Sequence, residues 1–234
     1  MRQDICTIPI SEVFEVNDGC PICRMREIIE KRIVEYIMGA AMMEPDVRIE
    51  TNKYGFCERH FDMMLNTRGR LQLALILESH VAEIGKNIFE KKLFNSASKK
   101  GDKAQKLSNS CFVCNKVDWG FENMIRTIFL SFENDREFRD MFESQPYICL
   151  PHYELLMNSP DKKILKKYNS EFEKTLTKLT GEYVKSLKED LTKYCAMYDY
   201  RAKQEKMEWG TSRDSVERTI AFLNGRHYSE DWLT

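Results

Sequence analysis

The sequence predicts an all-α protein, a helical bundle built from two tandem copies of one three-helix unit with a further helix at the C-terminus. Three observations predict this fold. Apolar residues recur at helical spacing through most of the 234-residue chain. No stretch shows the sustained alternation of a half-buried strand, and residues 7–10 are the only strand-like candidate. Finally, the two halves of the chain align with each other.

The internal duplication is clearest in two short segments. FCERHFDMMLN at 56–66 aligns with ICLPHYELLMN at 148–158, which has the same order of Cys, His, aromatic, acidic, apolar and Asn positions. Further upstream, residues 33–38 align with the apolar residues of 124–129. We therefore expect three parts, which are an N-terminal half at 1–94, a polar Lys/Ser-rich linker at 95–110, and a C-terminal half at 111–234.

Helix starts are predicted at four short motifs that contain cysteine. Pro21 follows Cys20, and proline is favoured at the first position of a helix. Apolar residues recur at helical spacing from Arg24 to Met43, and a similar stretch opens after Cys111 and runs to Leu130. Pro151 is compatible only with a helix that begins near Cys149, because proline is tolerated in the first turn and not in the interior. The equivalent helix of the first half should begin near Cys57.

Longer helices are expected after the helix starts at Cys57 and Cys149. Apolar residues recur at helical spacing over 71–88 and again over 165–198. Gly181 interrupts the second pattern, at a cost of about 1 kcal/mol relative to alanine. Residues 211–214 resemble a capping box that opens a last helix, and Gly225 is suited to end it.

Six of the eight cysteines and two of the four histidines form a repeated motif. A CxxC at Cys20 is followed by a CxxH at Cys57, and a CxxC at Cys111 is followed by a CxxH at Cys149. Ligands three residues apart lie on one face of a helix turn, and a helix N-terminus favours thiolate over thiol. We therefore predict one Cys3His metal site in each half, with the ligands Cys20, Cys23, Cys57 and His60 in the first and Cys111, Cys114, Cys149 and His152 in the second.

Zinc is the metal that these ligands favour, with two ions per chain. A Cys3His set supplies the four ligands of a closed tetrahedral structural site. An iron–sulfur cluster is the alternative, since imidazole can replace a thiolate there, although neither half has the short CxxCxxC run of bacterial ferredoxins. Covalent haem is excluded because Arg24 and Asn115, and not histidine, follow the two CxxC motifs.

The function predicted from these sites is that of a non-enzymatic interaction or regulatory module. The sequence has no GxGxxG, P-loop, HExxH or GxSxG motif, and protein ligands fill all four positions of each predicted site. Whether the chain is an enzyme stays open. The alternative function is a redox- or metal-responsive protein or enzyme that uses one Cys3His site, as a zinc thiolate or an iron–sulfur cluster. His80 is expected to be an ordinary interface histidine.

Charge and hydropathy limit the classes of partner. With 36 basic and 37 acidic residues, the chain has no net attraction for nucleic acid or an anionic membrane. No apolar run has the length of a membrane span, and the first residues do not resemble a signal peptide, so we expect a cytoplasmic protein. The apolar stripe at 165–198 leaves room for a protein partner or for a second copy of the chain.

The doubled CPIC…GFCxxH arrangement, preceded by an IPI segment, resembles a family of uncharacterised bacterial proteins of similar size, a domain of unknown function. The resemblance covers most of the chain and implies a bacterial, intracellular protein. It supplies no activity, substrate or catalytic residue. The two halves differ at two positions next to the ligands: Tyr147 stands where the first half has Gly55, and Pro151 where it has Arg59. Equal metal affinity of the two sites is therefore not expected.

Overall fold

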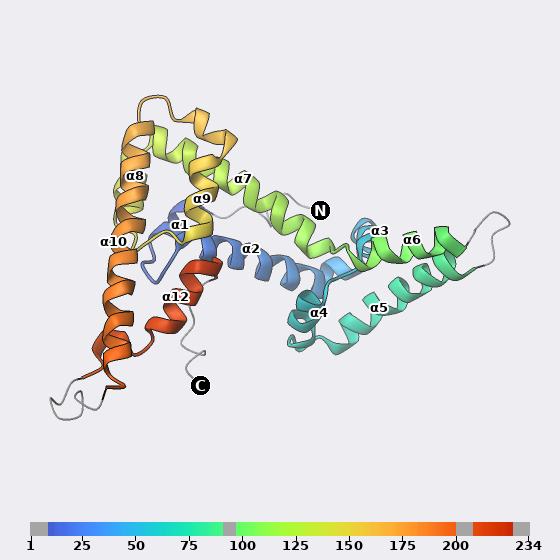
Figure 1. The fold of residues 1–234 in the computed structure, drawn as a ribbon. Coiled ribbons are helices and arrows are strands. Elements are labelled where there is room, and N and C mark those ends of the chain that lie inside the picture. Colours follow the sequence, from blue (N-terminus) through green and yellow to red (C-terminus); the bar gives the residue numbers. More distant parts are fainter. Residues whose placement is uncertain (1–8, 91–96, 200–207, 227–234) are drawn as a thin grey trace. The chain divides into compact units, whose positions relative to one another are not determined.

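The computed structural model describes residues 9–90, 97–199 and 208–226, which are helical with connecting turns (Figure 1). Within these ranges there is no strand, and the predicted all-α class is confirmed. The strand-like candidate at 7–10 lies partly outside the described residues, and Ile10 begins a helix. None of the described helices combines the length and the apolar composition that crossing a bilayer would require.

The helices follow one another in a simple order along the chain. They are α1 (Ile10–Phe14), α2 (Pro21–Met38), the 3-10 helix η2 (Ala40–Met43), α3 (Pro45–Tyr54), α4 (Glu58–Leu65), α5 (Arg70–Ile84), the π-helical turn η3 (Gly85–Phe89), α6 (Ala97–Ser108), α7 (Phe112–Asn134), α8 (Arg136–Glu143), α9 (Leu150–Asn158), the 3-10 helix η4 (Pro160–Ile164), α10 (Asn169–Ala196), the 3-10 helix η5 (Gly210–Ser212) and α12 (Ser215–Asn224). The segment expected to be a polar linker, 95–110, thus contains α6.

The four predicted helix starts are confirmed. α2 begins at Pro21 and α7 at Phe112, each directly after a cysteine of its CxxC motif. Cys57 and Cys149 are the N-cap residues of α4 and α9. Every metal-binding motif therefore lies at the first turn of a helix, where unpaired backbone N–H groups and the helix dipole favour anionic sulfur.

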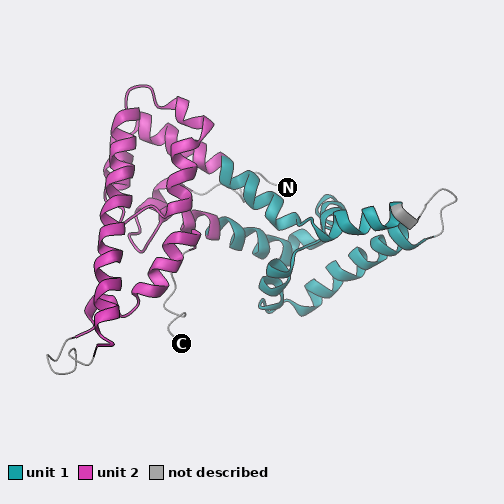
Figure 2. Cartoon of the chain, in the orientation of Figure 1, with its two compact units in different colours: residues 1–8, 28–122 teal, residues 9–27, 123–234 magenta. Residues whose placement is uncertain are grey.

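Two compact units divide the chain in a way that differs from the two sequence halves (Figure 2). Unit 1 comprises residues 1–8 and 28–122, and unit 2 comprises residues 9–27 and 123–234. The boundaries fall inside α2 and α7, so the first turns of each of these helices belong to one unit and the remainder to the other. Each unit consequently contains segments from both halves of the duplicated sequence.

Unit 2 has an aromatic core. Phe138 and Phe142 lie four residues apart on one face of the short helix α8, and both are buried. The Phe142 ring centroid is 5.3 Å from that of Phe172 on α10 and 5.7 Å from that of Phe14 on α1. Phe132 of α7 packs edge-on against Phe172, with centroids 5.0 Å apart. These contacts hold α1, α7, α8 and α10 together.

The ends of α10 and α12 differ in part from the sequence prediction. α10 begins at Asn169 and not at residue 165, and Glu133 accepts hydrogen bonds from the backbone N–H groups of residues 166–168 in the stretch before the helix. The predicted capping box does not form. Thr211 instead donates to the carboxylate of Asp190. Gly225 does end α12, in the left-handed conformation with φ 65°.

Unit 1 is built mainly from aliphatic side chains of α2, α3 and α5. Ile33 and Ile37 of α2 are fully buried, and α3 packs against α5. His80 of α5 is buried, and its Nδ1 lies 3.2 Å from the carbonyl oxygen of Asn52 on α3. This hydrogen bond supports the expected interface role of His80. The α5 helix then continues into the π-helical turn η3.

Candidate metal centres

The eight predicted ligands come together in two groups of four, each with its ligand atoms within 4.8 Å of one another. The unit 2 site consists of Cys20, Cys23, Cys149 and His152, and the unit 1 site consists of Cys57, His60, Cys111 and Cys114. The predicted pairing of the motifs is wrong. Each CxxC lies with the CxxH of the other half of the sequence, and not with the CxxH that follows it.

Helix length explains the exchanged pairing. At 1.5 Å per residue, the 18 residues of α2 span about 27 Å and the 23 residues of α7 span about 35 Å. The helices that follow, α3 with 10 residues and α8 with 8, span only about 15 Å and about 12 Å. A long helix leads away from each CxxC and a short one cannot bring the chain back to it, so the following CxxH joins a different site.

The unit 2 site is closed and buried. The Sγ atoms of Cys23 and Cys149 are 3.6 Å apart. The Nδ1 atom of His152 lies 3.0 Å from the sulfur of Cys149, 3.4 Å from that of Cys23 and 3.6 Å from that of Cys20. All four residues are buried. The first turn of α2 is held in place by Arg24, whose guanidinium donates to the carbonyl oxygen of Val13 and pairs with Asp18.

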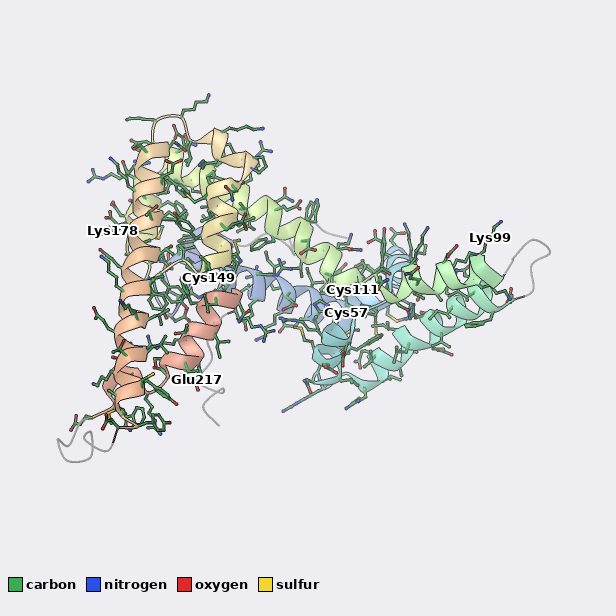
Figure 3. The ribbon with its side chains drawn as sticks, in the orientation of Figure 1. Cys57, Lys99, Cys111, Cys149, Lys178 and Glu217 are labelled. Atoms are coloured by element: carbon green, nitrogen blue, oxygen red, sulfur yellow. The ribbon has the colours of Figure 1, made fainter. Side chains whose placement is uncertain are left out.

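The unit 1 site has the same donors and is less buried. The Sγ atoms of Cys57 and Cys114 are 3.9 Å apart. His60 Nδ1 lies 3.1 Å from the sulfur of Cys57, 3.2 Å from that of Cys111 and 3.5 Å from that of Cys114. Cys57 and Cys114 are half-buried, whereas His60 and Cys111 are buried. Figure 3 labels Cys57 and Cys111, which come from the starts of α4 and α7.

These distances fit a four-coordinate metal ion. With Zn–S bonds of about 2.3 Å and Zn–N bonds of about 2.0 Å, a tetrahedron separates two sulfurs by about 3.8 Å and a sulfur from a nitrogen by about 3.5 Å. The sulfur pairs at 3.6 and 3.9 Å bracket the first value. The sulfur–nitrogen distances of 3.0–3.6 Å reach the second at their upper end. Both donor sets can therefore hold one zinc ion, with histidine coordinating through Nδ1.

The electrostatics of each group also favour a bound cation. Burial opposes ionisation of Cys111, but interactions with His60 and nearby backbone N–H groups outweigh it and lower the pKa to about 6. Burial and the charge of Cys111 raise the pKa of Cys114 to about 12. In the unit 2 site, interactions among the thiols likewise raise the pKa of Cys23 and Cys149. Three thiolates in so small a volume repel one another, and a divalent cation removes that repulsion.

Glu30 supports the histidine of the unit 1 site and was missed by the sequence analysis. Its Oε1 lies 2.9 Å from His60 Nε2, and its carboxylate also accepts two hydrogen bonds from Arg59, at 2.9 and 2.5 Å. Burial opposes ionisation of Glu30, but these hydrogen bonds from His60 and Arg59 lower its pKa overall. Glu30 thereby fixes the Nε2–H tautomer and leaves Nδ1 for the metal.

A substitution at Glu30 should weaken metal binding in one site only. We expect Glu30→Gln to lower the zinc affinity of the unit 1 site by about 10- to 100-fold, because carboxylates that orient ligand histidines typically contribute this much. A competition titration with a chromogenic chelator would then show one weakened ion and one unchanged ion. Glu35→Gln, at an exposed position of the same helix, is the matched control. Equal weakening of both ions would contradict the assignment of Glu30.

The remaining cysteines and histidines lie outside both sites where the structure describes them. His80 is in the α3–α5 interface, and Cys195 is exposed on α10. Cys6 and His227 fall outside the described residues.

Comparison with known proteins finds one family whose model matches nearly the whole chain. The family model described as "Family of unknown function (DUF6062)" matches residues 1–230. The chain belongs to this family. The matched range contains both metal-binding groups of this DUF6062 member, and the resemblance noted from the doubled motif is confirmed. No curated protein and no solved structure matches the chain.

Proposed function

We propose that this DUF6062 protein is a non-enzymatic interaction or regulatory module in which both Cys3His groups bind structural zinc, two ions per chain. One observation carries the proposal: in each group, four protein donors converge on a single point. Catalytic zinc sites keep a position open for water or substrate, whereas closed sets of four Cys and His ligands are typical of structural zinc.

The position of the ligands in the chain supports a structural role. The zinc ion of the unit 2 site would join Cys23 to Cys149, which are 126 residues apart, and that of the unit 1 site would join Cys57 to Cys114, which are 57 residues apart. Such a connection removes a large loop-closure entropy from the unfolded chain. Each ion would tie the first turns of two helices from opposite halves of the sequence, and so stabilise the interleaved arrangement.

Coordination of zinc by cysteine thiolates also favours a location in a reducing compartment. Zinc-binding thiolates persist where glutathione and thioredoxin keep cysteine reduced, as in the bacterial cytoplasm. A bacterial, cytoplasmic protein therefore remains our proposal for its setting, with another protein or a second copy of the chain as its partner and with neither nucleic acid nor membrane expected.

The deciding experiment is metal analysis of the full chain, purified without oxygen or added metal, together with its absorption spectrum. Two zinc ions per chain and no visible absorption are expected. Iron with visible charge-transfer bands would overturn the proposal in favour of an iron–sulfur protein. A chain that binds no metal stoichiometrically would overturn it as well.

A second candidate function is supported by the difference in burial between the sites. Cys57 and Cys114 of the unit 1 site are half-buried, whereas all four ligands of the unit 2 site are buried. Exposed thiolates are the ones that oxidants reach. In this second proposal the unit 1 site is a redox switch. Peroxide oxidises two of its thiolates to a disulfide and is itself reduced to water, and the zinc ion then leaves the site.

This switch predicts release of zinc in two separate phases. With limiting peroxide and a chromogenic chelator present, one ion per chain should be released at least about tenfold faster than the other, because reaction follows thiolate exposure. Dithiothreitol followed by zinc should restore the original content. Release of both ions at a single rate would argue against the switch and leave the structural proposal standing.

A further inference from the structure

Unit 1 contains a cavity that takes no part in the metal site. It has a volume of about 640 Å³ and lies among α3, α6 and the end of α5 with its π-helical turn η3. This volume is within the range of small-molecule sites in proteins, about 300–1,000 Å³. The cavity is therefore large enough for a small organic molecule.

The interior of the cavity is apolar. Ile88 of η3 is buried, and Ile84, Tyr54 and Leu107 are half-buried around it. Ile49 of α3 also lines the cavity and has 66% of its surface exposed. An isoleucine this exposed gains little from folding, but it would lose contact with water if an apolar group entered the cavity. The walls therefore fit the hydrocarbon part of a ligand.

The charged part of the lining is mainly cationic. Lys53, Lys103 and Lys106 line the cavity together with a single acid, Glu83. Glu83 is already engaged, since its Oε1 accepts a hydrogen bond of 2.6 Å from Asn87. Three ammonium groups against one carboxylate make the cavity locally positive in a chain whose net charge is -1. This charge complements an anionic head group and disfavours a cationic one.

The π-helical turn η3 is a second, independent feature that points to a ligand. Here the backbone N–H of Glu90 bonds to the carbonyl oxygen of Gly85, five residues earlier, at 2.9 Å. Such turns are rare and occur frequently at functional sites. Two residues of this turn, Asn87 and Ile88, line the cavity, and Lys103 Nζ donates to the carbonyl oxygen of Asn87 at 3.1 Å.

We propose that this cavity binds a small amphipathic carboxylate, with its hydrocarbon chain against the isoleucines and leucine and its carboxylate among the lysines of α3 and α6. The cavity wall also adjoins the metal-binding loops. Ser110 Oγ donates to the carbonyl oxygen of Tyr54 at 2.7 Å, and Phe112 N donates to that of Gly55 at 2.9 Å. Because these bonds join the segments that lead into Cys57 and Cys111, the metal-loaded chain is the form in which to test binding.

Decanoate is a suitable probe, measured by isothermal titration calorimetry below its micelle concentration. One saturable site per chain is expected. Decan-1-ol, which has the same hydrocarbon chain without the charge, should bind at least tenfold more weakly, and decylamine more weakly still. The absence of saturable decanoate binding would overturn the proposal. Equal or tighter binding of the alcohol or the amine would do the same.

Two pairs of variants locate the site. Lys103→Gln with Lys106→Gln should weaken decanoate binding by about tenfold or more, whereas Lys99→Gln with Lys100→Gln, the same charge change on the same helix outside the cavity, should leave it within about twofold. All four lysines lie on α6. Lys103→Gln removes one exposed hydrogen bond, to the carbonyl oxygen of Asn87, so the near-ultraviolet circular dichroism of each lysine variant should match that of the unchanged chain.

Ile49→Glu at the cavity should also weaken binding, and Met43→Glu, at an equally exposed position outside it, should not. If the control variants weaken binding as much as the cavity variants, decanoate binds elsewhere and the proposal fails.

Discussion

Replacing Cys20 and Cys149 together by serine is expected to leave one tightly bound metal ion per chain, whereas replacing Cys20 and Cys57 together leaves none. In the structure Cys20 and Cys149 belong to the same site, so the first double variant destroys one site. Cys20 and Cys57 belong to different sites, so the second damages both. Pairing within each sequence half predicts the opposite result for both variants. Metal analysis after passage over a chelating resin separates the two arrangements.

Two further variants complete this test. Cys57→Ser with Cys111→Ser removes two ligands of the unit 1 site and should again leave one ion. Cys195→Ser changes an exposed thiol that belongs to neither site and should leave two. Should the Cys20/Cys57 variant keep one ion while the Cys20/Cys149 variant keeps none, the exchanged pairing would be refuted.

Removal of both metal ions is expected to abolish the cooperative thermal unfolding of the chain. Structural zinc sites contribute apparent binding free energies of about 10–16 kcal/mol, which matches or exceeds the net stability of a typical domain, about 5–15 kcal/mol. Chelation under reducing conditions should therefore remove the near-ultraviolet circular dichroism of the packed aromatic core around Phe142 and Phe172. Part of the far-ultraviolet helical signal should be lost with it.

Reversal by metal separates this effect from irreversible damage. Adding two equivalents of zinc to the reduced, metal-free chain should restore both spectra and the thermal transition, whereas magnesium, which prefers oxygen ligands, should not. A metal-free chain that keeps its near-ultraviolet spectrum and melts within a few degrees of the loaded chain would show that the sites are not structural.

The helical fold and the eight ligands were predictable because the signals for them are local. Pro21 and Pro151 mark the first turns of α2 and α9, and a CxxC or CxxH at a helix start is visible in a few residues. The exchange of ligands between the two halves has no such local signal in the sequence. The duplication gives both halves the same motifs at nearly the same spacing, so a ligand of one half cannot be distinguished by type from its counterpart in the other. The available signal for the exchange was the predicted length of the helix after Cys23, because a helix of that length holds Cys23 far from Cys57.

Two other features depend on tertiary contacts that the sequence only hints at. Helix α6 forms in a segment with many lysines and serines and few apolar residues, where it packs against the π-helical turn η3. Glu30 lies on the apolar face of α2 beside Ile29 and Ile33, and an acid at such a position indicates a buried partner. The identity of that partner, His60, follows only from the hydrogen bond that joins α2 to α4 in the structure.

The pairing of ligands from opposite halves also determines how long each site stays incomplete during translation. Cys23 leaves the ribosome 126 residues before its partner Cys149. At about 5–20 residues per second, translation of that interval takes about 6–25 seconds. From the synthesis of His60 until that of Cys149, a complete but incorrect ligand set is available to the first CxxC, because Cys57 and His60 precede Cys149 in the chain. The stiff α2 helix keeps these two motifs apart, and its early formation would protect the nascent chain from closing the wrong site.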